Sequence, residues 1–333
     1  MIEILYWFAF FLCTGIITFC GSRLSKYGDI IAEKTGLSAT WIGIILMATV
    51  TSLPELITGI SSVTYAEAPD IAVGDILGSC IFNMLILSLI DIQYRPAPIT
   101  SMAHHGHILS AGLCLLLLTV VSLGLFLGER IYPFGWIGPY TLIFIFLYLV
   151  GMKLIYVYEK KRLSKYIKER AIKYEDIYTK KAVFKYVLNA TFVIVAAILL
   201  PEIGKGIAEI TGLGQTFVGN ILIAFTTSLP EVVVTFSAVK IGAIELAIGN
   251  LFGSNLFNIF VLGIDDIFYF KGPLLSYVNK SHIVSALSAM AMISIAIIGI
   301  TYRAERKKLF LAWDSLGLIL VYLINVMLLY SLY

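Results

Sequence analysis

The pentapeptide Thr-Ser-Leu-Pro-Glu occurs twice in this chain, at residues 51–55 and 227–231, inside long apolar runs. A glutamate at the depth of a bilayer is costly, so Glu55 and Glu231 are expected to serve a function. A buried carboxylate needs a cation or a proton, and neither copy brings a Lys or Arg partner. Helix packing by two protonated glutamates is the alternative, and the pattern favours cation binding.

The prolines of the two copies should free backbone oxygen atoms. Proline has no N–H, so Pro54 leaves the carbonyl of Val50 without its helical donor, and Pro230 does the same to Thr226. The distortion can release the neighbouring threonine carbonyls too. Such backbone is tolerated in a membrane only where it is buried or lines a wet cavity. Carbonyls, hydroxyls and carboxylates are the hard oxygen ligands that Na⁺ and Ca²⁺ prefer.

A second pair of polar blocks follows the pentapeptides. Residues 74–83 match residues 249–258, and both blocks contain Gly-Ser-x-x-x-Asn. The serine and the asparagine are four residues apart and share a helix face, as do the serine and the glutamate three apart in each pentapeptide. The glycines Gly78 and Gly253 allow helices to approach closely. Four side chains join the candidate site in this way, namely Ser79, Asn83, Ser254 and Asn258.

The matched blocks indicate an internal duplication. A third match joins residues 31–37 to residues 207–213, and the offset between the copies is 176 residues for the pentapeptides and 175 for the last block. Each half is predicted to hold five helices. Because five is odd, the second half enters the membrane from the opposite side, which is the inverted repeat typical of secondary transporters.

Composition predicts an all-α integral membrane protein. Of the 333 residues, 59% are hydrophobic and 14% are charged, which is too apolar for a soluble protein of this size. Continuous rather than alternating apolar runs disfavour a β-barrel. The first run has no basic segment before it and is predicted to be a retained helix. The ten predicted transmembrane helices are 2–22, 39–64, 70–92, 107–127, 134–157, 183–203, 215–240, 243–268, 282–301 and 309–331.

Charge predicts the orientation. The segment from Lys153 to Lys185 carries eleven of the 24 Lys and Arg residues, and cytoplasmic loops carry such an excess. We therefore expect a cell-membrane protein with a cytoplasmic central loop and both termini outside. The predicted division is a first repeat at 1–157, a basic linker at 158–182 and a second repeat at 183–333. Acidic residues are assigned to the opposite loops: Glu67, Asp70, Glu129, Asp265 and Asp266.

At these blocks the chain resembles the cation/calcium exchanger superfamily, in particular the prokaryotic sodium/calcium exchangers. The resembling segments are the two α-repeats, at about 31–92 and 207–268, and the paired motifs in inverted repeats are highly specific. The ten-helix plan also fits, so the resemblance extends over essentially the whole chain.

The resemblance implies a set of ligands. The family's motif glutamates chelate Ca²⁺, which implies Glu55 and Glu231 as main ligands, completed by the carbonyls of Thr51 and Thr227. The flanking Na⁺ sites would share the glutamates and add the hydroxyls of Ser52, Ser79, Ser228 and Ser254 and the carbonyls of Ala48 and Ala224. Asn83 and Asn258 would line the middle of the site. The first and sixth helices of such exchangers slide across the core during alternating access.

Three departures from the family pattern stand out. Val50 and Thr226 replace a usual glycine, and Asn258 replaces an aspartate that some prokaryotic members carry. Asp75 stands where the family, and Asn250 of the second repeat, has asparagine. Asp75 is therefore an accessory carboxylate near the ion pathway or an acid at a helix start near the membrane surface, and the second role is favoured.

Charge arithmetic suggests antiport. One Ca²⁺ or two Na⁺ neutralise two carboxylates, and three Na⁺ leave one positive charge, so the two ions would compete for one site. The expected function is a secondary active antiporter exchanging Ca²⁺ for Na⁺ by alternating access. A proton- or potassium-coupled exchanger is the alternative, and a channel or receptor is the alternative of another class.

Neither a nucleotide motif nor any other feature supports an enzyme, and no cofactor, nucleic acid or obligate protein partner is predicted, only inorganic cations and membrane lipid. The four cysteines lie in apolar runs without metal spacing and are expected to pack as small apolar residues. His104, His105 and His107 are expected to form an interfacial patch on the cytoplasmic side rather than a metal site.

Overall fold

The computed structural model describes residues 2–34, 51–94, 97–163, 179–240, 242, 244–307 and 311–332, and every regular element in these ranges is helical. The longer helices are α1 (Ile2–Lys34), α3 (Leu53–Thr64), α4 (Pro69–Gln93), α6 (Gly106–Leu127), α7 (Pro139–Leu163), α8 (Thr179–Thr211), α11 (Leu229–Lys240), α12 (Ile244–Phe268), α13 (His282–Tyr302) and α14 (Trp313–Ser331). Short elements complete the set: α5 (Ile99–Met102), η1 (Gly128–Arg130), α9 (Gln215–Phe217), η2 (Val218–Ile223), α10 (Ala224–Thr227) and η3 (Leu274–Ser276).

The described ranges contain eight helices long and apolar enough to cross a membrane. A ninth span results if α9 to α10 and α11 are counted together, because these two pieces are bent by 46° at their junction. These nine coincide with nine predicted segments. The remaining prediction, 39–64, is described only from residue 51, where α3 forms its second half. The chain is therefore a multi-pass, all-helical membrane protein.

Several helices extend beyond their predicted bounds. The first was predicted at 2–22, but α1 continues to Lys34, and α7 and α8 extend into the predicted linker at 158–182. The prediction followed the apolar part of each segment, which is what the bilayer core requires. Polar residues at the ends continue the same backbone hydrogen bonds outside that core. Residues 164–178 of the predicted linker lie outside the described residues.

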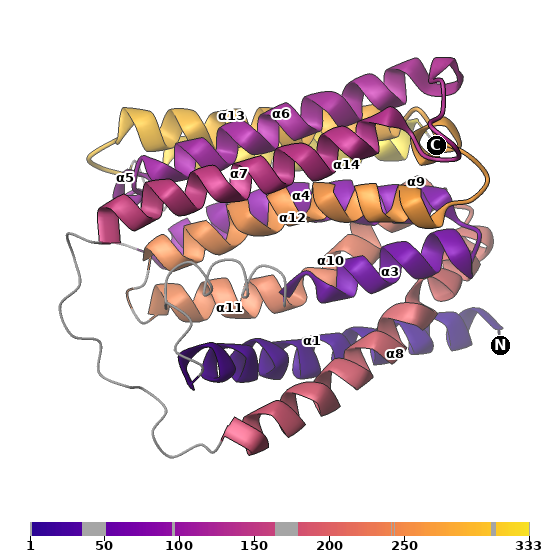
Figure 1. The fold of residues 1–333 in the computed structure, drawn as a ribbon, viewed down its shortest axis with the longest axis horizontal. Helices are drawn as coiled ribbons and strands as arrows, with labels where there is room; N and C mark the ends of the chain where they lie inside the picture. Colours follow the sequence, from indigo (N-terminus) through magenta and orange to yellow (C-terminus); the bar gives the residue numbers. More distant parts are fainter. Residues whose placement is uncertain are drawn as a thin grey trace.

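Helices α4 and α12 form the centre of the molecule (Figure 1). Of their most apolar windows, 89% and 83% of residues are buried, against 28% for both α1 and α8. The larger apolar core surrounds α4 and α12, and a smaller one lies between α1, α8 and the start of α4. All four cysteines are buried and free, as expected for small apolar side chains. The two helices that carry the Gly-Ser-x-x-x-Asn blocks are thus the most enclosed elements.

The contacts of the central helices are reciprocal. α4 packs on α13 and α14, while α12 packs on α6 and α7. In the same way α3 lies against α8 and α12, and α10 with α11 lies against α1 and α4. Each helix of the first half therefore packs where its sequence counterpart packs in the second half.

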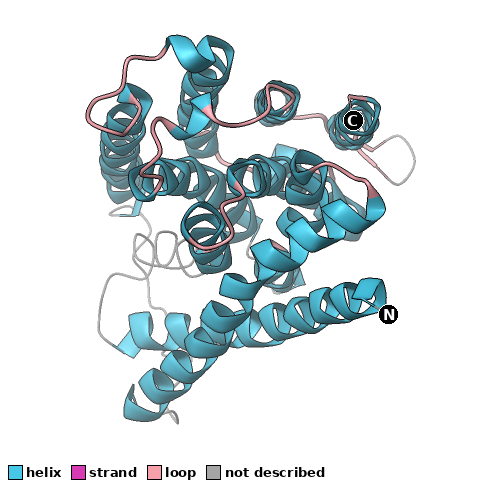
Figure 2. Cartoon of the chain, turned by 90° about the vertical axis from the view of Figure 1, so that its right-hand side faces the viewer, coloured by secondary structure: helices cyan, strands magenta, loops and turns pink. Residues whose placement is uncertain are grey.

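The helix pair α1 and α8 forms a separate outer layer. The two helices pack along each other, and Tyr6 of α1 lies on the backbone of Gly206 in α8. Figure 2, seen from the end of the molecule at which both termini lie, shows these two helices crossing outside the main bundle. This pair contacts the bundle mainly through α3, α10 and α11, which carry the pentapeptides, and through η2, which precedes the second one.

Two buried aspartates anchor equivalent connections. Asp266, near the end of α12, accepts hydrogen bonds from the backbone N–H of Gly138 (2.8 Å) and Leu274 (2.6 Å). Asp91, 175 positions earlier and near the end of α4, accepts from Ile99 N (2.8 Å) and Ala312 N (2.9 Å). Each carboxylate thereby fixes the turn after its own helix and the start of α7 or α14.

The prediction that assigned Asp265 and Asp266 to a loop is wrong. Both residues belong to α12 and are fully buried. The hydropathy pattern could not separate a charged loop from a helix end whose carboxylates turn inward.

Candidate cation-binding site

Both pentapeptides break their helix at the serine, with nearly the same backbone geometry. Ser52 has φ −90° and ψ 17°, and Ser228 has φ −84° and ψ 4°, both close to the sparsely populated bridge region. The next helices begin at Leu53 and Leu229, so Pro54 and Pro230 lie in the first turn, where a missing N–H does no harm. The predicted break is confirmed for the second copy by the 46° bend. The break turns the serine and the glutamate toward different neighbours.

The two glutamates are bound by hydroxyl groups of both halves. Ser52 donates to Oε1 of Glu231 (2.9 Å), and Ser228 donates to Oε1 of Glu55 (3.2 Å). Each motif serine therefore contacts the glutamate of the other copy. The sequence had placed each serine on the helix face of its own glutamate, which did not allow for the break.

The Gly-Ser-x-x-x-Asn serines complete this arrangement within their own halves. Ser79 of α4 donates to Glu55 Oε1 (3.4 Å), and Ser254 of α12 donates to Glu231 Oε1 (3.4 Å). Ser228 also donates to Ser79 (2.9 Å), which joins the two halves directly. All of these residues are fully buried. The predicted serines and glutamates thus form one cluster rather than two separate sites.

Asp75 borders this cluster. Its Oδ1 accepts a hydrogen bond from the hydroxyl of Thr227 (2.8 Å), which also lies 3.5 Å from the hydroxyl of Ser79. Asp75 is fully buried, well inside α4. The favoured prediction, a position at a helix start near the membrane surface, is wrong, because the carboxylate turns inward to the second pentapeptide.

The asparagines are not equivalent. Asn83 donates from Nδ2 to Oδ1 of Asn255 (2.9 Å), and Asn255 donates to the carbonyl of Cys80 (3.3 Å). Asn258 is fully buried, and neither its Oδ1 nor its Nδ2 has a hydrogen-bond partner. Sequence reasoning missed Asn255, because its counterpart in the first half is Cys80 and it therefore falls outside the repeated pattern.

A π-helical turn, η2, precedes the second pentapeptide. It packs so tightly on α4 that a Cβ added to Gly78 would lie 2.2 Å from the carbonyl oxygen of Asn220. The predicted close approach at Gly78 is confirmed. π-Helical turns often mark functional sites, and nothing in the sequence announced this one. Ala224, predicted to offer its carbonyl, begins α10, and that carbonyl accepts from Ser228 N (3.1 Å).

The outer helix α1 lies directly on the second pentapeptide. A Cβ at Gly21 would meet the ring of Pro230 at 2.6 Å, and the hydroxyls of Thr14 and Thr226 are 3.1 Å apart. Ala48 of the predicted site and Val50, which replaces the family's usual glycine, lie outside the described residues. Thr51 is described and fully buried.

Each glutamate has a second carboxylate oxygen that accepts no hydrogen bond. Oε2 of Glu55 and Oε2 of Glu231 are buried without a hydrogen-bond partner. The donors to the other oxygen are hydroxyls, which can rotate and offer a lone pair to a cation instead. Two buried carboxylates lined by hydroxyl oxygens form a site that suits a hard cation.

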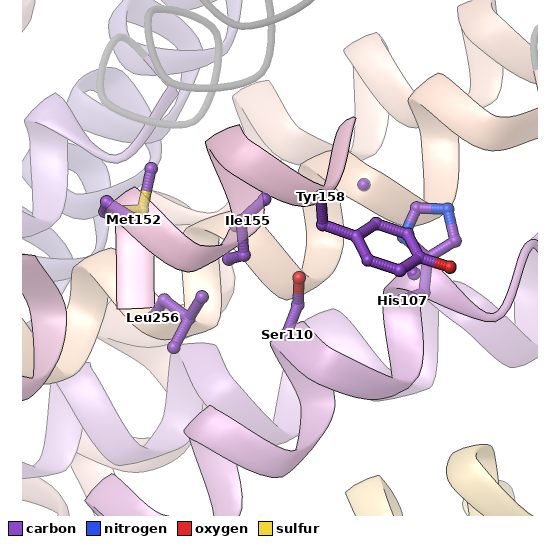
Figure 3. A pocket seen from close by; sticks show the side chains of 9 residues that line it. His107, Ser110, Met152, Ile155, Tyr158 and Leu256 are labelled. Atoms are coloured by element: carbon purple, nitrogen blue, oxygen red, sulfur yellow. The ribbon is translucent and has the colours of Figure 1, made fainter. Parts of the chain in front are cut away.

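The three histidines make contacts with residues outside the glutamate cluster. His107 contacts Glu245 of α12 (2.9 Å), while His104 and His105 pack ring to ring at 6.3 Å. Figure 3 shows the cavity beside His107, lined by Ser110 of α6, by α7 residues such as Tyr158, and by Leu256 of α12. Gly253, predicted to allow close helix approach, also lines this cavity.

The sequence matches a known protein family and several of its members. The sequence profile of the family described as sodium/calcium exchanger protein matches residues 5–157 and 181–331. The sodium/calcium exchanger MaX1 of Methanosarcina acetivorans is 26% identical over 332 residues, which cover 89% of this chain and 90% of that protein. An uncharacterized membrane protein of Methanocaldococcus jannaschii is 30% identical over 255 residues, covering 75% and 78%.

Solved structures share the fold. The sodium-calcium exchanger NCX_Mj soaked with 2.5 mM Na⁺ and 0.1 mM Sr²⁺ superposes with a TM-score of 0.62 at 22% identity, covering 98% of this chain and 99% of its own. Native YfkE gives a TM-score of 0.66 at 16% identity, covering 97% and 92%. The family profile spans nearly the whole chain, including both pentapeptides and both asparagine blocks. This chain belongs to the sodium/calcium exchanger protein family.

Proposed function

We propose that this protein is a secondary active antiporter that exchanges Ca²⁺ for Na⁺ at the paired glutamates. The observation that carries the proposal is the crossed pair of hydrogen bonds, Ser52 to Glu231 and Ser228 to Glu55. Because each half orients the carboxylate of the other, one shared site results. One ion at this site would contact both halves at once.

The ligands are proposed on the same geometry. Ca²⁺ would bind the carboxylates of Glu55 and Glu231 and the carbonyls of Thr51 and Thr227. Na⁺ would bind at flanking positions that share these carboxylates and use the serine hydroxyls around them. The residues proposed for Na⁺ besides the glutamates are Ala48, Ser52, Ser79, Asn83, Ala224, Ser228, Ser254 and Asn258.

Electrostatics supports mutual exclusion of the two ions. Two ionised carboxylates in a buried site carry a formal charge of −2, which one Ca²⁺ or two Na⁺ neutralise. Leaving such a charge uncompensated in a low-dielectric region is strongly unfavourable. The empty site is therefore expected not to change its access. After one ion is released on one side, the other must bind before the site can return, and that requirement couples the two fluxes.

Alternating access would arise from two inverted five-helix repeats, here 1–157 and 183–333. The reciprocal packing of α4 and α12 supports this division. The outer pair α1 and α8 lies on the elements that carry the pentapeptides, and a slide of this pair would cover or open one side of the site. Proton coupling is the second candidate, because Asp75 adds a buried carboxylate that repeat two replaces with Asn250.

Transport in proteoliposomes tests the proposal. Ca²⁺ uptake driven by an outward Na⁺ gradient is expected to fall below one-hundredth in Glu55→Gln and in Glu231→Gln. The matched control is Glu67→Gln, which changes an exposed glutamate paired with Lys271 at 2.8 Å and should leave uptake intact.

Varying one gradient at a time identifies the coupling ion. Uptake that follows a pH gradient without Na⁺ would replace Na⁺ by protons in the proposal. Full Na⁺-driven exchange in either glutamine variant would refute the site.

A further inference from the structure

A second buried acidic residue lies one helical turn from Glu55. A Cβ built on Gly59 of α3 would come within 2.4 Å of Oδ2 and 2.5 Å of Oδ1 of Asp265, so this carboxylate rests on the bare backbone of Gly59. Gly59 follows Glu55 by four residues, about 6 Å along the helix. Asp265 is fully buried, and neither of its oxygens has a hydrogen-bond partner.

The repeat indicates that Asp75 faces the same point. In the second half, Nδ2 of Asn250 donates to the hydroxyl of Thr235 at 3.3 Å. The first-half counterparts, by the offsets of 175 and 176 residues, are Asp75 and Gly59. The first half thus has an acid where the second has an amide, and an open space where the second has a hydroxyl. Asp265 fills that space.

Three carboxylate oxygens of these two aspartates have no donor. Oδ2 of Asp75, like both oxygens of Asp265, is buried without a hydrogen-bond partner. The carboxyl groups of Asp75 and Asp266 are the titratable neighbours that influence Asp265. Asp266 is occupied by its four donors from residues 138–141 and 274. The carboxyl groups whose buried oxygens still lack a partner are therefore those of Asp75 and Asp265.

We infer that Asp75 and Asp265 form a second divalent-cation site at Gly59, beside the glutamate site. A pair of buried carboxylates with free oxygens needs protons or a cation, and one divalent ion would neutralise both. The counterpart of Asp265 in the first half is Ile90, so the pair occurs on one side only. The choice of Ca²⁺ as the ion rests on the proposed function. An ion that reaches Glu55 from this side would pass Gly59.

Equilibrium binding of radioactive Ca²⁺ to the full-length protein in lipid nanodiscs without Na⁺ tests the inference. Wild type is expected to bind two Ca²⁺ per chain, and Asp265→Asn one. Glu55→Gln combined with Glu231→Gln should also bind one, at the remaining pair. A failure of the glutamate site and a failure of the aspartate site therefore give different results.

Glycine and threonine exchanges supply a matched pair of variants. Gly59→Thr introduces the residue of the second half and displaces the Asp265 carboxylate, so one ion should be lost. Thr235→Gly makes the reverse change beside Asn250, and two ions should remain. One Ca²⁺ in wild type, two in Asp265→Asn, or equal losses in Gly59→Thr and Thr235→Gly would each overturn the inference.

Discussion

At the scale of single residues, the motif serines act across the molecule rather than on their own glutamates. Ser52 and Glu55 are three residues apart, which in a continuous helix would place them on one face. The break at Ser52 removes that relation, and the hydroxyl reaches Glu231 instead. The sequence predicted that the motif serines and glutamates lie together, because each side chain offers an oxygen ligand for a cation. It could not predict their pairing, which depends on how the two halves meet.

The crossed hydrogen bonds give a prediction for paired substitutions. Ser52→Ala and Ser228→Ala each remove a hydroxyl that orients a buried carboxylate, and a hydrogen bond to a charged group contributes about 1.5–3 kcal/mol. The apparent Ca²⁺ affinity should therefore fall about tenfold or more in each variant. Titration of Ca²⁺ against transport rate in proteoliposomes measures this loss. Ser88→Ala is the control, because Ser88 bonds only to Leu85 of its own helix, and an equal loss there would contradict the assignment.

At the scale of helices, both members of the outer pair, α1 and α8, make polar contacts with the bundle. On α8, the carbonyl of Ala197 accepts from Ser61 of α3 at 3.3 Å. On α1, Thr14 meets Thr226 at 3.1 Å, just before the break at Ser228. Thr226 is one of the residues that depart from the family's usual glycine, and its hydroxyl gives the departure a role, because it contacts the helix expected to slide.

This contact predicts an effect on the rate of transport. Thr14→Val removes a hydrogen bond of about 0.5–1.5 kcal/mol between α1 and α10, so α1 should leave the bundle more readily. The maximal exchange rate is expected to change about two- to tenfold while the apparent Ca²⁺ affinity stays constant. Thr18→Val is the matched control, because Thr18 bonds only within α1, to the carbonyl of Thr14. A shift in affinity without a change in rate would contradict this role.

The positions of the helices were largely predictable, whereas their ends and irregular turns were not. Apolar length identified α4 and α12 correctly, because the bilayer demands it. The π-helical turn η2 packs closely on Gly78 through Asn220, and such a contact between segments far apart in the chain is not visible in the sequence. The same limit concealed Asp265, whose surroundings are set by Gly59 in another helix.

At the scale of the whole molecule, the two halves share a plan but differ in charge. The anchors Asp91 and Asp266 occupy equivalent places, and so do the two pentapeptide breaks. Asp75 and Asp265 have no acidic counterparts, since Asn250 and Ile90 take their positions. The duplicated plan supports one central site, and the unmatched acids would make one side of that site more attractive to cations than the other.

The orientation of this asymmetric molecule in the membrane is predicted by its basic residues. The excess of Lys and Arg between Lys153 and Lys185 predicts that this segment faces the cytoplasm and that both termini lie outside. Tyr132, before α7, and Glu305, after α13, are exposed and should then face outside and inside. The four native cysteines are buried, so a membrane-impermeant maleimide should report introduced cysteines alone. Tyr132→Cys should be labelled on intact cells and Glu305→Cys only after permeabilisation. The reverse pattern would place the side bearing Asp75 and Asp265 toward the cytoplasm, where Ca²⁺ would be loaded for export.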